Sequence, residues 1–323
     1  MKIGIVGAGL IVEVFLEAVK RIGALRPEAI CVREGRMDRA LELSEKYGIR
    51  TQYTDYAQML NDPEIDFVYI ALPNRLHYGY AAQALKSHVN VLVEKPAVLT
   101  AAEFKELARL AEENRLFLFE CITTVHLPNF QDIKKRIGEI GPIRTVEANY
   151  TQYSSRYDQF RQGVVTNIFN PAMGGGALMD LNQYNVHFAV GMWGEPEEVC
   201  YYPNLRNGID TSGVLVLRYR NFLCSCIGAK DSHGDSHVAI HGENGCIRVG
   251  SAPNECRFYE IKTDGGAETV NRQQQDNRLY YELCNFSDIY DRRDYEKRNL
   301  LLEHSGRVAG VLEKARQFAR MSF

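Results

Sequence analysis

The sequence predicts an α/β protein with a doubly wound parallel sheet over residues 1–120, followed by an α+β domain with a large, mostly antiparallel open sheet over residues 121–323. Three observations predict this class. Short apolar strands alternate with helices up to about residue 120. After Cys121, several strands follow one another with the alternating pattern of antiparallel sheets. A length of 323 residues is enough for two hydrophobic cores.

Composition and charge exclude several classes of protein. The net charge is −3, whereas proteins that bind nucleic acid or membrane surfaces usually carry a basic excess. No apolar run approaches the roughly 20 residues of a membrane span. The first residues lead directly into a strand, without the apolar segment of a signal peptide. We therefore expect a soluble cytoplasmic protein with no nucleic-acid or membrane partner.

No metal site is predicted. The eight cysteines are scattered through apolar segments without a CxxC pair, which favours free thiols. Cys224 and Cys226 share one face of a predicted strand, and this is only a weak indication of metal binding. The histidines at 233, 237 and 241 are four residues apart, but on a predicted strand and turn that spacing separates neighbours by roughly 13 Å.

The first element is a strand over residues 2–6, followed by Gly7-Ala8-Gly9 and a helix to about Ile22. Strand, glycine turn and helix in this order form the context of a dinucleotide fingerprint. Gly7 allows the tight turn, Gly9 lets the backbone approach a pyrophosphate, and the helix N-terminus supplies N–H groups. Val12 stands where a Gly or Ala is usual. The predicted cofactor contacts at this turn are Gly7, Ala8, Gly9, Leu10 and Ile11.

The second strand, near residues 29–32, ends in Arg33-Glu34-Gly35-Arg36, where such a fold places the residue that contacts the adenosine ribose. Glu34 would accept hydrogen bonds from a free 2′-hydroxyl and favour NAD. Arg33 or Arg36 would pair with a 2′-phosphate and favour NADP. The sequence leaves NAD and NADP open, and we lean slightly to NAD through Glu34.

Two further strand ends carry candidate residues. The strand near residues 89–94 is apolar and stops at Glu94-Lys95-Pro96, because proline cannot continue the pairing. Lys95 therefore falls at the carboxyl end of a parallel strand, where open α/β sheets bind ligands. The strand near residues 67–70 ends at the same edge. Its predicted cofactor contacts are Leu72, Pro73, Asn74 and His77, beside Glu94 and Lys95.

The other elements of the first domain are predicted as helices near 37–47, 56–60, 77–87 and 100–114, and strands near 51–53 and 116–119. The second domain is predicted to contain helices near 126–137, 177–193, 277–291 and 299–320. Its strands are predicted near 143–152, 198–203, 211–219, 222–229, 236–241, 245–249 and 256–261. The long polar loop over 154–173 is of a kind that is usually functional or mobile. Its candidate substrate contacts are Arg156, Tyr157, Arg161 and Asn170.

A glycine run at 174–176 precedes a helix that carries Asp180 and Tyr184. Residues four apart lie above one another on a helix face, and His187 follows on the same side. The glycines allow the first turn to approach another group closely. An acid above a phenol is a plausible pair for handling protons.

The motifs described above occur in order at fitting spacings, and the sequence resembles the glucose–fructose oxidoreductase / inositol dehydrogenase / MocA family over nearly its whole length. The motifs that carry the resemblance are Gly7-Ala8-Gly9, Ala71-Leu72-Pro73-Asn74 with His77-Tyr78, Glu94-Lys95-Pro96, the glycine run with Asp180 and Tyr184, and Tyr281-Glu282.

The resemblance implies an NAD(P)-dependent oxidoreductase with an N-terminal Rossmann domain for the cofactor. It also implies a C-terminal domain for substrate binding and oligomerisation, whose open sheet often forms the interface of a homodimer or homotetramer. By the same resemblance Lys95, Asp180 and Tyr184 form the catalytic site. Many members have histidine where this chain has Tyr184, and the tyrosine variant resembles the dihydrodiol-dehydrogenase-like branch.

Hydride transfer at a carbinol carbon requires a matching proton transfer at oxygen. Tyr184, Lys95 or a relay between them could handle that proton, with Asp180 as the orienting group. The expected substrate is a sugar, a cyclitol or a diol. Two alternatives are an enzyme that retains and recycles its nucleotide, including a hydrolase acting by transient oxidation, and a non-catalytic dinucleotide sensor.

Overall fold

The computed structural model describes residues 1–321 and divides into two compact units. The first unit contains Met1–Cys121 and Asn277–Gly306, and the second contains Ile122–Asp276 and the chain from Arg307 on. The division by sequence followed chain order, whereas the structure adds a later segment to the first unit. The assignment of cofactor and substrate to separate domains stays a prediction.

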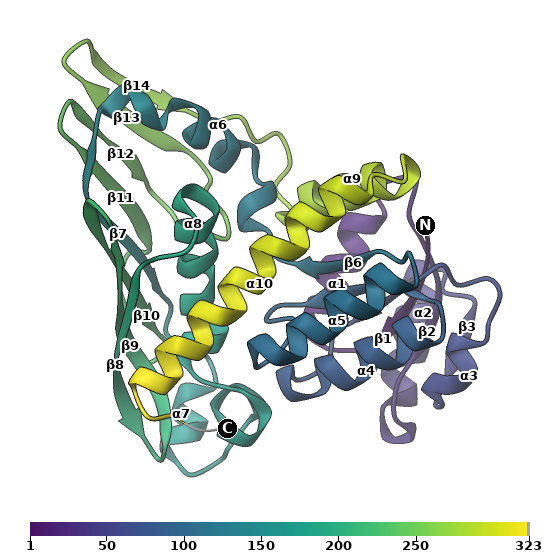
Figure 1. The fold of residues 1–323 in the computed structure, drawn as a ribbon. Helices are drawn as coiled ribbons and strands as arrows, with labels where there is room; N and C mark the ends of the chain where they lie inside the picture. The colour runs from purple at the N-terminus through teal and green to yellow at the C-terminus, as the bar shows by residue number, and fades with distance from the viewer. Residues whose placement is uncertain (322–323) are drawn as a thin grey trace. The chain divides into compact units, whose positions relative to one another are not determined.

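The first unit is built on a parallel sheet of six strands in the order β3-β2-β1-β4-β5-β6 (Figure 1). The order reverses between β1 and β4, and doubly wound sheets bind ligands at such a switch point. The predicted parallel sheet is therefore confirmed. The strands are β1 (Lys2–Val6), β2 (Arg26–Cys31), β3 (Thr51–Tyr53), β4 (Phe67–Ile70), β5 (Asn90–Glu94) and β6 (Leu118–Cys121).

Helices follow the strands of this sheet, and their ends have local causes. Thr100 and Glu103 form a capping box that starts α5, since each side chain accepts a hydrogen bond from main-chain N–H groups at the helix start. Gly48 ends α2 in the left-handed conformation. The helices are α1 (Leu10–Val19), α2 (Met37–Tyr47), α3 (Tyr56–Leu60), α4 (Asn74–Lys86) and α5 (Ala101–Glu113).

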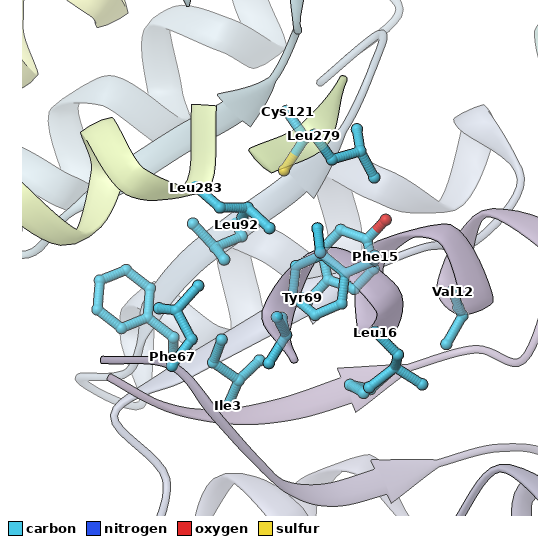
Figure 2. Packing of buried hydrophobic residues seen from close by; sticks show 14 of the residues in the cluster. Ile3, Val12, Phe15, Leu16, Phe67, Tyr69, Leu92, Cys121, Leu279 and Leu283 are labelled. Atoms are coloured by element: carbon cyan, nitrogen blue, oxygen red, sulfur yellow. The ribbon is translucent and has the colours of Figure 1, made fainter. Parts of the chain in front are cut away.

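The late segment of the first unit is α9 (Leu279–Asp291) with the first part of α10 (Tyr295–Phe318). Leu279 and Leu283 of α9 join the hydrophobic core between α1 and the sheet (Figure 2). Asn277 donates a 2.9 Å hydrogen bond to the carbonyl oxygen of Val14. The apolar face of α9 is thus buried in the core that the first residues of the chain begin. The members of this core that Figure 2 labels are Ile3, Val12, Phe15, Leu16, Phe67, Tyr69, Leu92, Cys121, Leu279 and Leu283.

The second unit is built on an eight-stranded sheet in the order β14-β13-β12-β11-β7-β10-β9-β8. The β7–β10 pair is parallel and the other pairs are antiparallel, so the predicted mostly antiparallel sheet is confirmed. The last strand was not predicted, because four of its five residues are exposed and show no alternation. The strands are β7 (Ile143–Thr151), β8 (Glu198–Arg206), β9 (Ile209–Tyr219), β10 (Phe222–Ala229), β11 (His237–Gly242), β12 (Gly245–Val249), β13 (Tyr259–Thr263) and β14 (Gly266–Val270).

One face of this sheet is covered by α6 (Pro128–Arg136) and α8 (Gln183–Trp193), as Figure 1 shows. A π-helical turn, Leu178–Asn182, precedes α8. Amides at the start of α8 bond to the sheet, since Asn182 donates to the carbonyl of Cys226 at 3.0 Å and Asn185 donates to that of Ile227 at 2.8 Å. These bonds fix the helix that carries Asp180 and Tyr184 against β10. Among residues 1–321, no helix is long and apolar enough to cross a membrane.

Candidate active site

The strands at the centre of the first unit end at one edge. Val6 pairs with Ile70 across β1 and β4, and Ile70 pairs with Val93 across β4 and β5. The residues that follow these strands therefore emerge side by side. Gly7, Leu72 and Glu94, which are among the predicted cofactor contacts, all belong to this edge.

The turn after β1 accepts only glycine at its first position. Gly7 has a φ of +109°, and an added Cβ would lie 2.5 Å from the carbonyl oxygen of Ala71. Gly9 is the N-cap of α1, no side chain caps the helix, and an added Cβ there would meet no atom within 4 Å. The start of α1 is thus an open cradle of main-chain N–H groups, which fits the pyrophosphate of a dinucleotide.

The ring of His77 bridges two strand ends. Its Nδ1 lies 2.8 Å from the carbonyl oxygen of Pro96, and its Nε2 lies 2.7 Å from that of Leu72. The side chain is buried, and burial lowers the pKa of His77, although the two carbonyl groups oppose this. The structure therefore gives His77 a positioning role at this edge, and direct contact with a cofactor stays a prediction.

Three buried carboxyl groups belong to the same unit as Lys95. Glu94 accepts a 2.7 Å hydrogen bond from the hydroxyl of Tyr69, and Glu120 accepts a 2.8 Å bond from the N–H of Ala97. Burial raises the pKa of Glu94 and of Glu120, and it raises that of Glu282 well above its ordinary value. Lys95 opposes the shifts of Glu94 and Glu120, so those carboxylates in turn favour its charged form.

The turn after β2 is exposed. Arg33 is the N-cap of a short 3₁₀ helix formed by Glu34–Arg36, and Arg33, Glu34 and Arg36 are all exposed. Either the carboxylate or the guanidinium groups could thus reach the ribose of a bound cofactor.

In the second unit, the glycine run approaches a carboxylate of the chain itself. Gly176 has a φ of +109°, and an added Cβ would lie 1.9 Å from Oδ1 of Asp210. The other oxygen of Asp210 accepts hydrogen bonds of 2.7 Å from the N–H of Leu178 and from the hydroxyl of Tyr201. Burial raises the pKa of Asp210 to about 6. The close approach expected from the glycines is confirmed, and Asp210 fixes the start of the π-helical turn.

Asp180 and Tyr184 each have a partner that the sequence did not reveal. The ammonium of Lys230 lies 2.8 Å from Oδ2 of Asp180. The ring of Tyr184 lies 5.7 Å from that of Tyr150, centre to centre, and Tyr184 is buried. His187 is completely buried. Direct contact between Asp180 and Tyr184 stays a prediction, since the π-helical turn intervenes in the spacing on which it was based.

The loop over 154–173 has a small core of its own. Tyr157 packs with Phe160 and Phe169, and Asn170 caps the turn at Pro171–Met173 by accepting a 3.0 Å hydrogen bond from Ala172. Two of the four substrate candidates are thus engaged in local structure. The other two, Arg156 and Arg161, are exposed.

A cavity of about 450 Å³ lies in the second unit between the end of β7 and the loops at 234–237 and 250–257. Its lining includes Tyr150, His237 and Arg248, and none of the four substrate candidates.

Cys224 and Cys226 share a face, with their sulfur atoms 3.7 Å apart. Within residues 1–321, no group of three or more His, Cys, Asp or Glu side chains is arranged to hold a metal ion.

Known proteins share both sequence and fold with this chain. The oxidoreductase family with an NAD-binding Rossmann fold matches residues 1–120, and the GFO/IDH/MocA C-terminal domain matches residues 130–248. The scyllo-inositol 2-dehydrogenase (NADP(+)) IolU of Bacillus subtilis is 31% identical, over 98% of this chain and 96% of that protein. The trans-1,2-dihydrobenzene-1,2-diol dehydrogenase of Mus musculus is 26% identical, over 99% and 97%.

Among solved structures, KijD10, a 3-ketoreductase from Actinomadura kijaniata in complex with NADP and TDP-benzene, has a TM-score of 0.86. It is 22% identical, and the match covers 98% of this chain and 97% of that one, so it shows a shared fold. Family matches in both parts of the chain agree with the six-stranded parallel sheet and with the mostly antiparallel one. The chain therefore belongs to the GFO/IDH/MocA oxidoreductase family, and it is an NAD(P)-dependent oxidoreductase.

Proposed function

We propose that the protein transfers a hydride between a nicotinamide cofactor and a carbinol or carbonyl carbon of a sugar, cyclitol or diol. The observation that carries the proposal is the edge where β1, β4 and β5 end, with the open start of α1 and Lys95 in the same unit. The cofactor, when bound, supplies or accepts the hydride at C4 of its nicotinamide. The names of the relatives, an inositol dehydrogenase and a dihydrodiol dehydrogenase, support the substrate class.

The residues proposed for catalysis are Lys95, Tyr184 and Asp180. The carbinol oxygen must lose or gain a proton when the carbon exchanges its hydride. A phenol such as Tyr184 has an ordinary pKa of about 10 and is a poor base unless a cation stabilises its phenolate. Lys95 is the cation that we propose for this role, with Lys95 itself as the alternative proton acceptor. Asp180, held by Lys230, is proposed to orient these groups or the substrate.

A screen of sugars, cyclitols and diols with NAD⁺ and NADP⁺, followed by the absorbance of the reduced nicotinamide, tests this function. We expect reduction with at least one polyhydroxylated substrate. A protein that binds cofactor but turns over no member of the panel would contradict the proposal and favour a sensor. Nucleotide that remains bound through purification, with no net reduction, would instead favour an enzyme that recycles its nucleotide.

The cofactor preference is proposed to depend on the turn after β2. If Glu34 binds the ribose 2′-hydroxyl, Glu34→Gln should raise the KM for NAD about tenfold, because a charge-assisted hydrogen bond is weakened. The KM for NADP should not rise. Steady-state kinetics with both cofactors measure this, with Glu45→Gln on the exposed face of α2 as the control.

The competing outcome is a preference for NADP, which the name of the Bacillus subtilis relative supports. In that case Arg33→Ala or Arg36→Ala would raise the KM for NADP, since each removes a partner of the 2′-phosphate. The Glu34→Gln variant would then leave the KM for NAD unchanged, which would contradict the proposed preference for NAD.

We propose that the second unit forms a homodimer or homotetramer through the open face of its sheet. Tyr202, Val214 and Ile227 are cross-strand neighbours on β8, β9 and β10, on the face away from the buried Leu215 and Cys226. Tyr202 is 59% exposed and Val214 is 38% exposed, and apolar patches of this kind favour association. Sedimentation equilibrium, which measures the molar mass of the protein in solution, tests this. Val214→Lys places a charge on the proposed interface and should lower that molar mass towards the value of a monomer. A monomeric wild-type protein would contradict it.

We also propose that the protein is cytoplasmic. All eight cysteines are free, including the partly exposed Cys200, Cys246 and Cys284. Free thiols fit a compartment that keeps cysteines reduced.

A further inference from the structure

Lys230 directly follows β10 and its side chain is almost completely buried, with 2% of its surface exposed. Its N–H donates a 2.8 Å hydrogen bond to the carbonyl of Thr211, and its carbonyl accepts a 2.9 Å bond from Ser154. The main chain is therefore fixed on both sides. The position of the ammonium group is then set by the contacts of the side chain alone.

Among the residues that the structure describes, the ammonium of Lys230 has three partners. It lies 2.8 Å from Oδ2 of Asp180, 2.8 Å from the carbonyl oxygen of Ile168, and 4.4 Å from the centre of the Phe169 ring. A buried ammonium is costly unless it is paired and hydrogen-bonded, and these contacts compensate it. Proteins in which an apolar side chain replaces a buried ion pair are often no less stable than the original. The stability of the fold alone therefore does not explain a lysine at this position.

The contacts of Lys230 join Asp180 to the loop that precedes it. The carbonyl oxygen of Ile168 accepts from Lys230 and also from the N–H of Gly176 at 3.1 Å, and the N–H of Asp180 donates to the carbonyl of Gly176 at 3.1 Å. The turn Asn167–Phe169 is thus tied both to the ammonium and to the start of the helix. A displacement of this turn would move the partner of Asp180.

We propose that Lys230 is a positioning residue, which holds Asp180 as an oriented carboxylate and makes its geometry depend on the order of the loop over 154–173. This inference rests on the proposed role of Asp180 in the reaction. The side chain of Asp180 is 28% exposed, so a substrate can reach it while one of its oxygens is held. The ammonium favours the charged form of that carboxylate and fixes its direction.

Lys230 also has Asp210 as a neighbour in space and Asp231 as its neighbour along the chain. Asp210 on β9 is buried and feels the ammonium, which opposes the rise of its pKa. Asp231, the next residue along the chain, accepts hydrogen bonds of 2.6 Å from Thr211 and 3.0 Å from Ser212. The Asp180→Asn variant lacks the Asp180 carboxyl group but keeps those of Asp210 and Asp231. Comparing its pH–rate profile with that of the wild type therefore shows which part of the profile is due to Asp180.

The test compares Lys230→Met, Lys230→Arg, Asp180→Asn and the double variant D180N/K230M, with the exposed Lys262→Met on β13 as the control. We expect Lys230→Met to lower kcat/KM by about 10- to 100-fold, the range for loss of a charge-assisted hydrogen bond. The acid limb of its pH–rate profile should move to higher pH, because Asp180 loses the cation that favours its ionisation. Lys230→Arg keeps the charge, so its acid limb should stay in place.

The double variant gives the decisive comparison. If Lys230 acts through Asp180, D180N/K230M should have the kcat/KM of Asp180→Asn within about twofold, and a further loss of tenfold or more would overturn the proposal. The double variant has neither the ammonium nor the carboxylate, so no unpaired charge is left at this position. The comparison can therefore be made even if Lys230→Met fails to fold. A Lys230→Met enzyme with a lower Tm but an unchanged pH–rate profile would also overturn it.

Failure of the proposed function would look different. Asp180→Asn with wild-type turnover would remove Asp180 from the reaction. Slow turnover in Asp180→Asn together with full activity in Lys230→Met would leave the proposed function in place and overturn only the role of Lys230.

Discussion

Replacing Lys95 by alanine is expected to lower turnover by about 10²- to 10⁴-fold, the range for removal of a general acid or base. Lys95 directly follows β5 at the edge where β1 and β4 also end. Cofactor affinity should persist, because the open start of α1 and the turn at Gly7 do not depend on the lysine side chain. The measurements are kcat with the best substrate of the screen and the Kd of the cofactor by titration calorimetry.

Two further variants serve as controls for Lys95→Ala. Lys86→Ala removes an exposed ammonium at the end of α4 in the same unit, and it should change neither quantity. Lys95→Arg retains a cation that cannot give up its proton in the working pH range. Activity in Lys95→Arg would assign Lys95 an electrostatic role and leave Tyr184 as the proton acceptor. Unchanged turnover in Lys95→Ala would exclude Lys95 from the mechanism.

The strand ends of the first unit could be predicted because their signals are local. Val91–Val93 is apolar and is followed at once by a charged pair and a proline, and Gly7 follows the apolar β1. Each pattern fixes where a parallel strand stops, and parallel strands stop at a common edge. The register of β1, β4 and β5 confirms this edge.

Contacts between distant segments could not be predicted in this way. Lys230 is a single lysine after a strand, and nothing nearby in the sequence indicates Asp180, which lies 50 positions earlier. Tyr157 was a candidate for substrate contact because it lies in a long polar loop, and the structure adds that it packs within the loop's own core. The helix α9 follows the second sheet in the chain, but its apolar face is buried against α1. Only tertiary packing decides such cases.

Glu282 on α9 is the clearest example of a residue whose burial could not be predicted from the sequence, since a glutamate on a helix is usually exposed. It is 1% exposed, and its Oε2 has no hydrogen-bond partner among the described residues. Burial raises its pKa well above the ordinary value, Glu94 and Glu120 add to this, and Arg278 opposes it. The folded protein therefore binds this proton more tightly than the unfolded chain does.

We expect Glu282→Gln to reduce the loss of stability at rising pH. A carboxyl group with a raised folded-state pKa contributes its full stability below its unfolded pKa of about 4.3, and the contribution is lost as pH rises through the folded-state pKa. Glutamine does not titrate, so the free energy of unfolding of the variant should fall less between about pH 5 and pH 9. Above both pKa values the variant should have lost less of its free energy of unfolding than the wild type, by about 1.4 kcal/mol for each unit that separates the two pKa values.

Urea denaturation followed by circular dichroism across this pH range measures the effect. The exposed Glu45→Gln on α2 should reproduce the wild-type pH dependence, because no buried charge is removed. A Glu282→Gln protein whose free energy of unfolding falls more steeply with rising pH than that of the wild type would show the opposite balance. The attraction between an ionised Glu282 and Arg278 would then outweigh the cost of burying the carboxylate.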